Sequence, residues 1–375
     1  MNTNQNPFRT YTPQQVVNQL SSFVNTQTRY DNLFQTAENY VLDYVGLHRF
    51  DPLALSRLVW SYASGGYKHP RLFNGVAKYI VDNYQLLNDF DPAALSIFIW
   101  AFAKADHRHR ALFEVVATHI CQLQSLDDFN SKSLSNVLWA YARVDHVDTQ
   151  LFNKVAIRIC SLKTLNNSSL QTVATLVWSS AKVGCYHEAL FDKIASYIVH
   201  DKNLFATEAN MRDITMLIWA YATVESSNHP VLFESLTEHV LTLDNLDSFS
   251  SFALTNLIWG LNQFTTPPTE LLYKVIDAAV KRDEAEALVR ICSSLFPNKK
   301  EICLKGLTNK CTGRECGKLH LDDDTKLLEV VIKHRWEKLV EEGMYSWIIY
   351  ILGMSFVALI SFTLYLFNSI QRRKP

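Results

Sequence analysis

The chain has 375 residues, of which 11 are glycine and 10 are proline. Each type makes up about 3% of the chain, below the roughly 7% and 5% of average proteins. This scarcity of turn formers disfavours β-sandwiches, barrels and disordered chains, and it favours helix. Lys and Arg number 36 against 37 Asp and Glu. The balance excludes a globally basic nucleic-acid binder but leaves room for a local basic patch.

The N-terminal residues 1–15 lack a basic region followed by an apolar stretch, so we expect no signal peptide. Residues 1–46 are predicted to form a degenerate first copy of a helical repeat. Phe34 matches an aromatic anchor of the later copies. Ser21 lies 39 residues before Trp60, at the position that tryptophan takes in those copies.

A repeat of about 40 residues fills the region 47–296. Six tryptophans follow one another at spacings of 40, 39, 39, 41 and 40: Trp60, Trp100, Trp139, Trp178, Trp219 and Trp259. A second aromatic recurs 13 or 14 residues after each of them: Phe73, Phe113, Phe152, Phe191, Phe233 and Tyr273. Such a constant period is typical of repeat proteins, whose units stack on their neighbours.

Each unit is predicted to be a hairpin of two amphipathic helices. Leu55, Leu58, Val59 and Tyr62 recur at helical spacing, and Asp51-Pro52 supplies an N-cap and a proline for the first turn. One hairpin cannot bury both of its apolar stripes, whereas stacked hairpins can. We therefore predict an all-α fold, a right-handed α-solenoid of about seven 40-residue helical hairpins with a C-terminal cap. The scattered Cys121, Cys160, Cys185 and Cys292 are expected to be reduced and buried.

The segments LIWAYAT and VLWAYAR, each followed by Leu-Phe, resemble the heptatricopeptide and octotricopeptide repeats over residues 14–282. These repeats occur in organellar RNA-binding proteins, including FAST-kinase-like proteins and RNA-editing substrate-binding subunits. The resemblance implies an RNA-binding helical-repeat protein. The RAP domain that ends many such proteins is not recognisable here, so no activity of that domain is expected.

We take the tryptophan to be a core position of the first helix. The residues three before and four after it then share one helical face. In the central repeats this face supplies three cations and two neutral polar residues: Lys104, Arg143, Lys182, Asn136 and Thr175. The family resemblance implies that such a face binds single-stranded RNA, with one repeat per base. A merely solvated face is the alternative.

Residues 299–322 are predicted to form a small zinc finger. Cys303, Cys311, Cys316 and His320 have the spacing C-x7-C-x4-C-x3-H, which provides a closed tetrahedral shell for one Zn²⁺. The pattern resembles CCCH zinc fingers, many of which bind RNA. Four basic residues surround the ligands and suit phosphates or an acidic protein partner: Lys305, Lys310, Arg314 and Lys318.

The C-terminal region is predicted to hold a membrane anchor. Residues 323–343 form an amphipathic connector helix, 344–368 a transmembrane helix and 369–375 a basic tail. The run 347–367 carries no charge over 21 residues, and about 20 suffice to cross a bilayer. We expect a single-pass tail-anchored protein with its N-terminal bulk in the cytosol. The short basic tail favours the mitochondrial outer membrane, with the endoplasmic reticulum as the alternative.

No phosphate-binding loop, nucleophile elbow, HExxH or dinucleotide-binding fingerprint occurs in the sequence. We therefore predict that the protein is not an enzyme. The leading function is a membrane-anchored RNA-binding repeat protein that acts in organelle-associated RNA metabolism or tethering. A protein–protein interaction scaffold at an organelle membrane is the alternative, and an enzyme subunit without its own active site is a third.

Overall fold

The computed structural model describes residues 7–278, apart from 25–28, 166–167, 202–203, 205–210, 225–228, 248, 263–270, 272–273 and 276–277. Every regular element in these residues is helical. The first helices of the hairpins are α1 (Pro13–Ser22), α3 (Pro52–Ser64), α5 (Pro92–Lys104), α7 (Ser131–Arg143), α9 (Leu170–Lys182), α12 (Met211–Thr223) and α14 (Ser251–Asn262). The second helices are α2 (Asp31–Asn39), α4 (Pro70–Asp82), α6 (Arg110–Gln122), α8 (Thr149–Ser161), α10 (Glu188–His200) and α13 (Pro230–Thr242).

Three short helical segments connect the early hairpins. A π-helix, η1 (Tyr40–Val45), continues α2, and the 3₁₀-helix η2 (Leu47–Arg49) leads into α3. A second 3₁₀-helix, η3 (Tyr84–Asp89), leads into α5. The contacts divide the chain into two compact units, residues 1–240 with 263–265 and residues 241–262 with 266–375.

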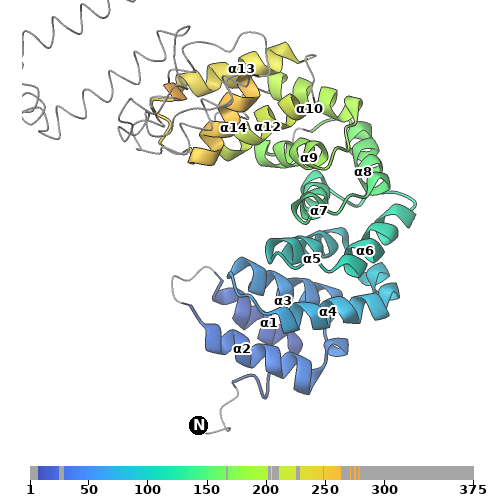
Figure 1. The fold of residues 1–375 in the computed structure, drawn as a ribbon. Coiled ribbons are helices and arrows are strands. Elements are labelled where there is room, and N and C mark those ends of the chain that lie inside the picture. The colour runs from blue at the N-terminus through green and yellow to red at the C-terminus, as the bar shows by residue number, and fades with distance from the viewer. Residues whose placement is uncertain are drawn as a thin grey trace, which may run out of the picture. The chain divides into compact units, whose positions relative to one another are not determined.

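The first unit is a two-layered stack of hairpins (Figure 1). In one layer α3 packs on α5, α5 on α7, α7 on α9 and α9 on α12. In the other layer α4 packs on α6, α6 on α8 and α8 on α10. The predicted repeat of helical hairpins is therefore confirmed.

Side-chain caps begin the first helices at equivalent positions. Asp51 and Asp91 each accept a hydrogen bond from the backbone N–H three residues later, at 2.7 Å, and a proline follows each of them. Asn130 and Ser169 accept the equivalent bonds at the starts of α7 and α9, at 2.8 Å and 3.2 Å. Because each such cap contributes about 1 kcal/mol, the starts of these four helices are defined locally.

A tyrosine two residues after the tryptophan joins consecutive hairpins. The hydroxyls of Tyr62, Tyr141 and Tyr221 each donate 2.7 Å hydrogen bonds to a backbone carbonyl of the preceding hairpin. The acceptors belong to the anchor residues Phe34, Phe113 and Phe191, which are at most 1% exposed. Burial raises the pKa of each of these tyrosines well above its usual value. The hydroxyls therefore remain protonated donors.

A lysine on the second helix makes another recurring joint. The Nζ of Lys154 donates to the backbone carbonyls of Cys121 and Leu123, at the C-terminal end of α6. Lys193 does the same to Cys160 and Leu162 at the end of α8. In the second unit, Lys274 contacts the carbonyls of residues 241 and 243. These ammonium groups satisfy carbonyls that the end of a helix leaves without intrahelical partners.

The three described cysteines are free thiols, as expected, but they are half-buried rather than buried. Burial raises the pKa of Cys121, Cys160 and Cys185, which makes the thiolate less available.

Candidate nucleic-acid interface

The repeated tryptophans do not lie in the core. Trp60, Trp100, Trp139, Trp178 and Trp219 are all half-buried, whereas the residues next to them on each helix are buried. In α3 the buried set includes Leu58, Val59, Ser61 and Tyr62 on either side of Trp60. The expectation that tryptophan is a core position is therefore corrected.

Helix packing explains this placement. The helices α3, α5, α7 and α9 are each covered by the preceding first helix and by the following one, and α7 and α9 also contact the second helices α8 and α10. One stripe remains uncovered, and on α3 it contains Leu53, Arg57, Trp60 and Ser64 at spacings of three and four residues. The tryptophan thus lies on the same face as the residues three before and four after it. We call this surface, on α3, α5, α7, α9 and α12, the tryptophan face.

Indole rings on the tryptophan face meet in pairs. The ring centroids of Trp100 and Trp139 are 5.8 Å apart, with the planes inclined by 31°. Those of Trp178 and Trp219 are 6.4 Å apart, inclined by 47°. Aromatic side chains that remain partly accessible in this way can stack on the bases of single-stranded nucleic acid.

Two of the predicted cations on this face are available to a ligand. Lys104 at the end of α5 and Arg143 at the end of α7 are exposed. Neither has an ion pair or a side-chain hydrogen bond within the part of the chain that the structure describes. Both lie one helical turn after a tryptophan, so a positive charge accompanies an indole in each of these repeats.

Lys182 is placed differently. Its Nζ donates a 2.6 Å hydrogen bond to the carbonyl of Ala142 in the preceding repeat and lies 3.0 Å from the carboxylate of Asp145. It also lies 5.5 Å from the centroid of the Trp178 ring. With only 26% of its side chain exposed, Lys182 joins α9 to α7 and is not a free cation.

An ionic network that the sequence did not suggest borders this face. Asp106 and Asp145 occupy the turns within successive hairpins at φ of 55° and 57°, a left-handed conformation that Asp tolerates. Arg108 bridges them, at 3.3 Å from Asp106 and 3.2 Å from Asp145. The bond from Lys182 and the charge of Arg108 lower the pKa of Asp145. The equivalent turn positions in two other hairpins are Gly66 and Gly184, so among these four hairpins the acidic turn residue occurs only between α5 and α6 and between α7 and α8.

The neutral polar residues of the face also differ from each other. The Thr175 hydroxyl donates to the Gln171 carbonyl of its own helix at 2.7 Å. Asn136, half-buried on α7, has no hydrogen bond to its carboxamide within the described residues. Ile97 and Met216 occupy the same position on α5 and α12. A free carboxamide is therefore a property of α7 among the described central repeats.

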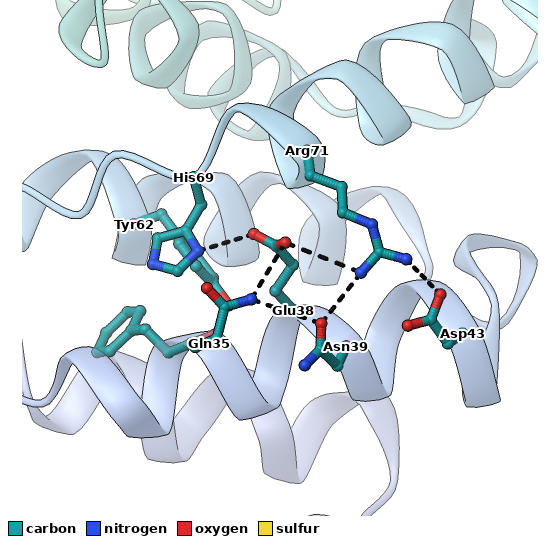
Figure 2. Close-up of polar contacts among 8 residues, drawn as sticks. Gln35, Glu38, Asn39, Asp43, Tyr62, His69 and Arg71 are labelled. Atoms are coloured by element: carbon teal, nitrogen blue, oxygen red, sulfur yellow. Dashed lines mark hydrogen bonds and ion pairs between the residues drawn. The ribbon is translucent and has the colours of Figure 1, made fainter.

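The most buried ionic cluster lies between α2 and α4, in the first two hairpins (Figure 2). The Glu38 carboxylate is 4% exposed and lies 2.7 Å from Nδ1 of His69, the residue that precedes α4. Arg71 reaches the same carboxylate at 3.9 Å and also bonds Asn39 and Asp43. Glu38 and Asn39 belong to α2 and Asp43 to η1, which continues it, whereas Arg71 belongs to α4. The cluster therefore acts as a structural joint, because these partners satisfy a carboxylate that would be costly to bury without hydrogen bonds.

The predicted zinc ligands and the membrane segment lie outside the described residues. This applies to Cys303, Cys311, Cys316 and His320, to Lys305, Lys310, Arg314 and Lys318, and to residues 347–367. Within the described residues, no cluster of three or more His, Cys, Asp or Glu side chains is suited to a metal ion. No described helix has both the length and the apolar character needed to cross a bilayer.

Comparison with known protein families matches residues 44–296 to the family described as RNA-editing substrate-binding complex 6 protein. The match covers the hairpins from η1 onward, including the whole tryptophan face. A search of curated proteins found no match.

Proposed function

Because the chain belongs to the RNA-editing substrate-binding complex 6 protein family, we propose that it binds single-stranded RNA along the tryptophan face, without catalysing a reaction itself. The observation that carries the proposal is the set of half-buried indoles in consecutive repeats, with Lys104 and Arg143 exposed and unpaired beside them. Indoles offer stacking surfaces that accept any base, and the two cations offer contacts to phosphates.

The basic residues of the face predict a specific salt dependence. Each phosphate contact to a single strand contributes roughly 0.7 to the slope of log K against log salt. Replacing Lys104 and Arg143 together by Ala should therefore reduce the slope by roughly 1.4. The measurement is a salt titration of the full-length protein, purified in mild detergent, with a labelled single-stranded RNA.

Lys182→Ala is the matched control, because Lys182 occupies the equivalent position in the next repeat but is held by Ala142 and Asp145. It should leave the slope unchanged. An unchanged slope in the double variant, or no RNA binding by the wild type, would reject the proposal in favour of a protein-interaction scaffold.

The same proposal includes one Zn²⁺ bound by Cys303, Cys311, Cys316 and His320, outside the described residues. Three thiolates and one imidazole are a donor set typical of structural zinc. Metal analysis should find one zinc per chain in the wild type and a reduced content in Cys311→Ala. Equal zinc content in the two proteins would contradict this assignment.

The proposal also includes anchoring through residues 347–367, with the mitochondrial outer membrane as the favoured location. The support is the uncharged apolar run, whose length matches a bilayer. Deleting residues 344–375 should release the protein from membranes. Extraction of the full-length protein by alkaline carbonate would argue against a spanning segment.

A further inference from the structure

One helix of the tryptophan face combines an amide, an indole and a guanidinium, and two of these three groups have no internal partner among the described residues. On α7, Asn136, Trp139 and Arg143 follow one another at spacings of three and four residues, so their side chains share a face. The carboxamide of Asn136 and the guanidinium of Arg143 have no bonded partners among the described residues. An amide, an aromatic ring and a guanidinium can contact the edge, the plane and the phosphate of a nucleotide, respectively.

The neighbouring helices lack this combination. Helix α5 has the apolar Ile97 at the position of Asn136. On α9 the hydroxyl of Thr175 is bonded to its own helix, and Lys182 is bonded to the preceding repeat. These repeats can add stacking or charge, but they do not offer a free donor and acceptor to a base.

The ring contacts of Trp139 are confined to one side of the indole. Its indole meets Trp100 on the side of α5, at 5.8 Å between centroids. On the side of α9, the next indole, Trp178, meets Trp219 instead. No ring contact joins Trp139 to Trp178, both of which the structure describes. Because Trp139 is half-buried, part of its indole remains accessible to a planar ligand.

We infer that α7 holds one nucleotide of the bound RNA: its base stacks on Trp139 on the side of α9, Asn136 bonds the edge of the base, and Arg143 contacts a phosphate. This inference rests on the proposed function and assigns base recognition to a single repeat. Residues 136 and 143 are separated by about 10 Å along the helix axis, with the indole between them, at 1.5 Å per residue. That order matches a nucleotide laid along the helix, from base edge to phosphate.

The chemistry of the carboxamide gives a direct test. An amide presents one acceptor and a donor group, so it can pair with the mixed donor and acceptor edges of the bases. Asn136→Asp keeps the shape but leaves only acceptors. Guanine alone has two adjacent donors on its Watson–Crick edge, N1–H and N2–H. The variant should therefore shift the base preference towards guanine.

The experiment is competition binding to the full-length protein in mild detergent, with oligouridine RNAs that differ in one central base. Asn136→Asp should raise the affinity for the guanine-containing RNA relative to the other three, while Asn136→Ala should abolish discrimination at that base. Trp139→Leu should weaken all four by about 5- to 150-fold, the loss expected for one stacked base. Thr175→Ala, at the equivalent position of α9, is the matched control and should leave relative affinities unchanged.

Unchanged relative affinities in Asn136→Asp, with RNA binding retained and helicity unchanged by circular dichroism, would overturn the α7 site and leave the proposed function standing. A shift towards guanine caused equally by Thr175→Asp would also overturn it, because recognition would then not belong to α7. Absence of RNA binding by the wild type would reject the inference together with the proposed function.

Discussion

The tyrosine joint between hairpins allows a quantitative test of the packing. Tyr141 is fully buried, and its hydroxyl donates a 2.7 Å hydrogen bond to the carbonyl of Phe113 in the preceding hairpin. Its ring meets that of Phe113 edge to face at 5.2 Å. Tyr141→Phe removes the hydroxyl and keeps the ring contact. The variant therefore isolates one hydrogen bond between two repeats.

The expected cost follows from what remains bonded. Phe113 lies within α6, so its carbonyl keeps an intrahelical partner after the substitution. The loss is then the net value of a hydrogen bond, about 0.5–1.5 kcal/mol, and not the larger penalty of an unsatisfied carbonyl. The measurement is urea unfolding followed by circular dichroism. Hydrogen exchange in α6 and α7 should show the local effect, because repeats contact only their neighbours.

The preceding repeat supplies a reverse control. Phe102 takes the position of Tyr141 in α5 and is buried against Phe73 at 5.2 Å. Phe102→Tyr should recreate the joint by donating to the Phe73 carbonyl, and it should not destabilise the protein. Because burial raises the pKa of Tyr141, the hydroxyl stays protonated, and its hydrogen bond should add the same amount to the free energy of unfolding at about pH 7 and about pH 9. A zero cost for Tyr141→Phe, or a cost above about 3 kcal/mol, would refute this reasoning.

Three further predictions concern charged groups. Burial raises the pKa of Asp213 to about 6, above its value in the unfolded chain. The buried carboxyl therefore lowers the free energy of unfolding by an amount that grows as pH rises from about 4 to about 6, and this loss of stability is absent below that window. Asp213→Asn should therefore be more stable than the wild type at neutral pH, by roughly 1–2 kcal/mol after allowance for solvent screening, and equally stable near pH 4 in urea unfolding. Lys193→Met should destabilise the contact of α8 with α10 by about 1–3 kcal/mol, because two carbonyls lose a charged donor; hydrogen exchange at the end of α8 should reveal it. Lys182→Met should raise the pKa of Asp145, measured by NMR titration, and an unchanged pKa would contradict the ion pair.

The period of the repeat and the boundaries of its helices could be predicted from the sequence because they depend on neighbouring residues. Asp51 and Asp91, each before a proline, define helix starts through bonds that span three residues. An aromatic anchor recurs in each copy, and the anchors Phe73, Phe113 and Phe191 are buried. Cap, proline and apolar spacing all act within one hairpin. The 40-residue spacing then indicates that similar hairpins stack on one another.

Only the tertiary structure determined which side chains lie on the tryptophan face and remain accessible there. Helical periodicity gives the angular order of side chains around a helix, but it does not say which sides neighbouring helices cover. An indole is apolar enough to be assigned to the core, yet Trp60 shares its stripe with the exposed Arg57. Lys104, Arg143 and Lys182 have equivalent positions and the same charge. Only Lys182 has a carboxylate from the preceding repeat, that of Asp145, within ion-pair distance, and a left-handed turn positions that residue. Local patterns therefore determined the hairpin, whereas contacts between hairpins determined which of its side chains remain available to bind a ligand.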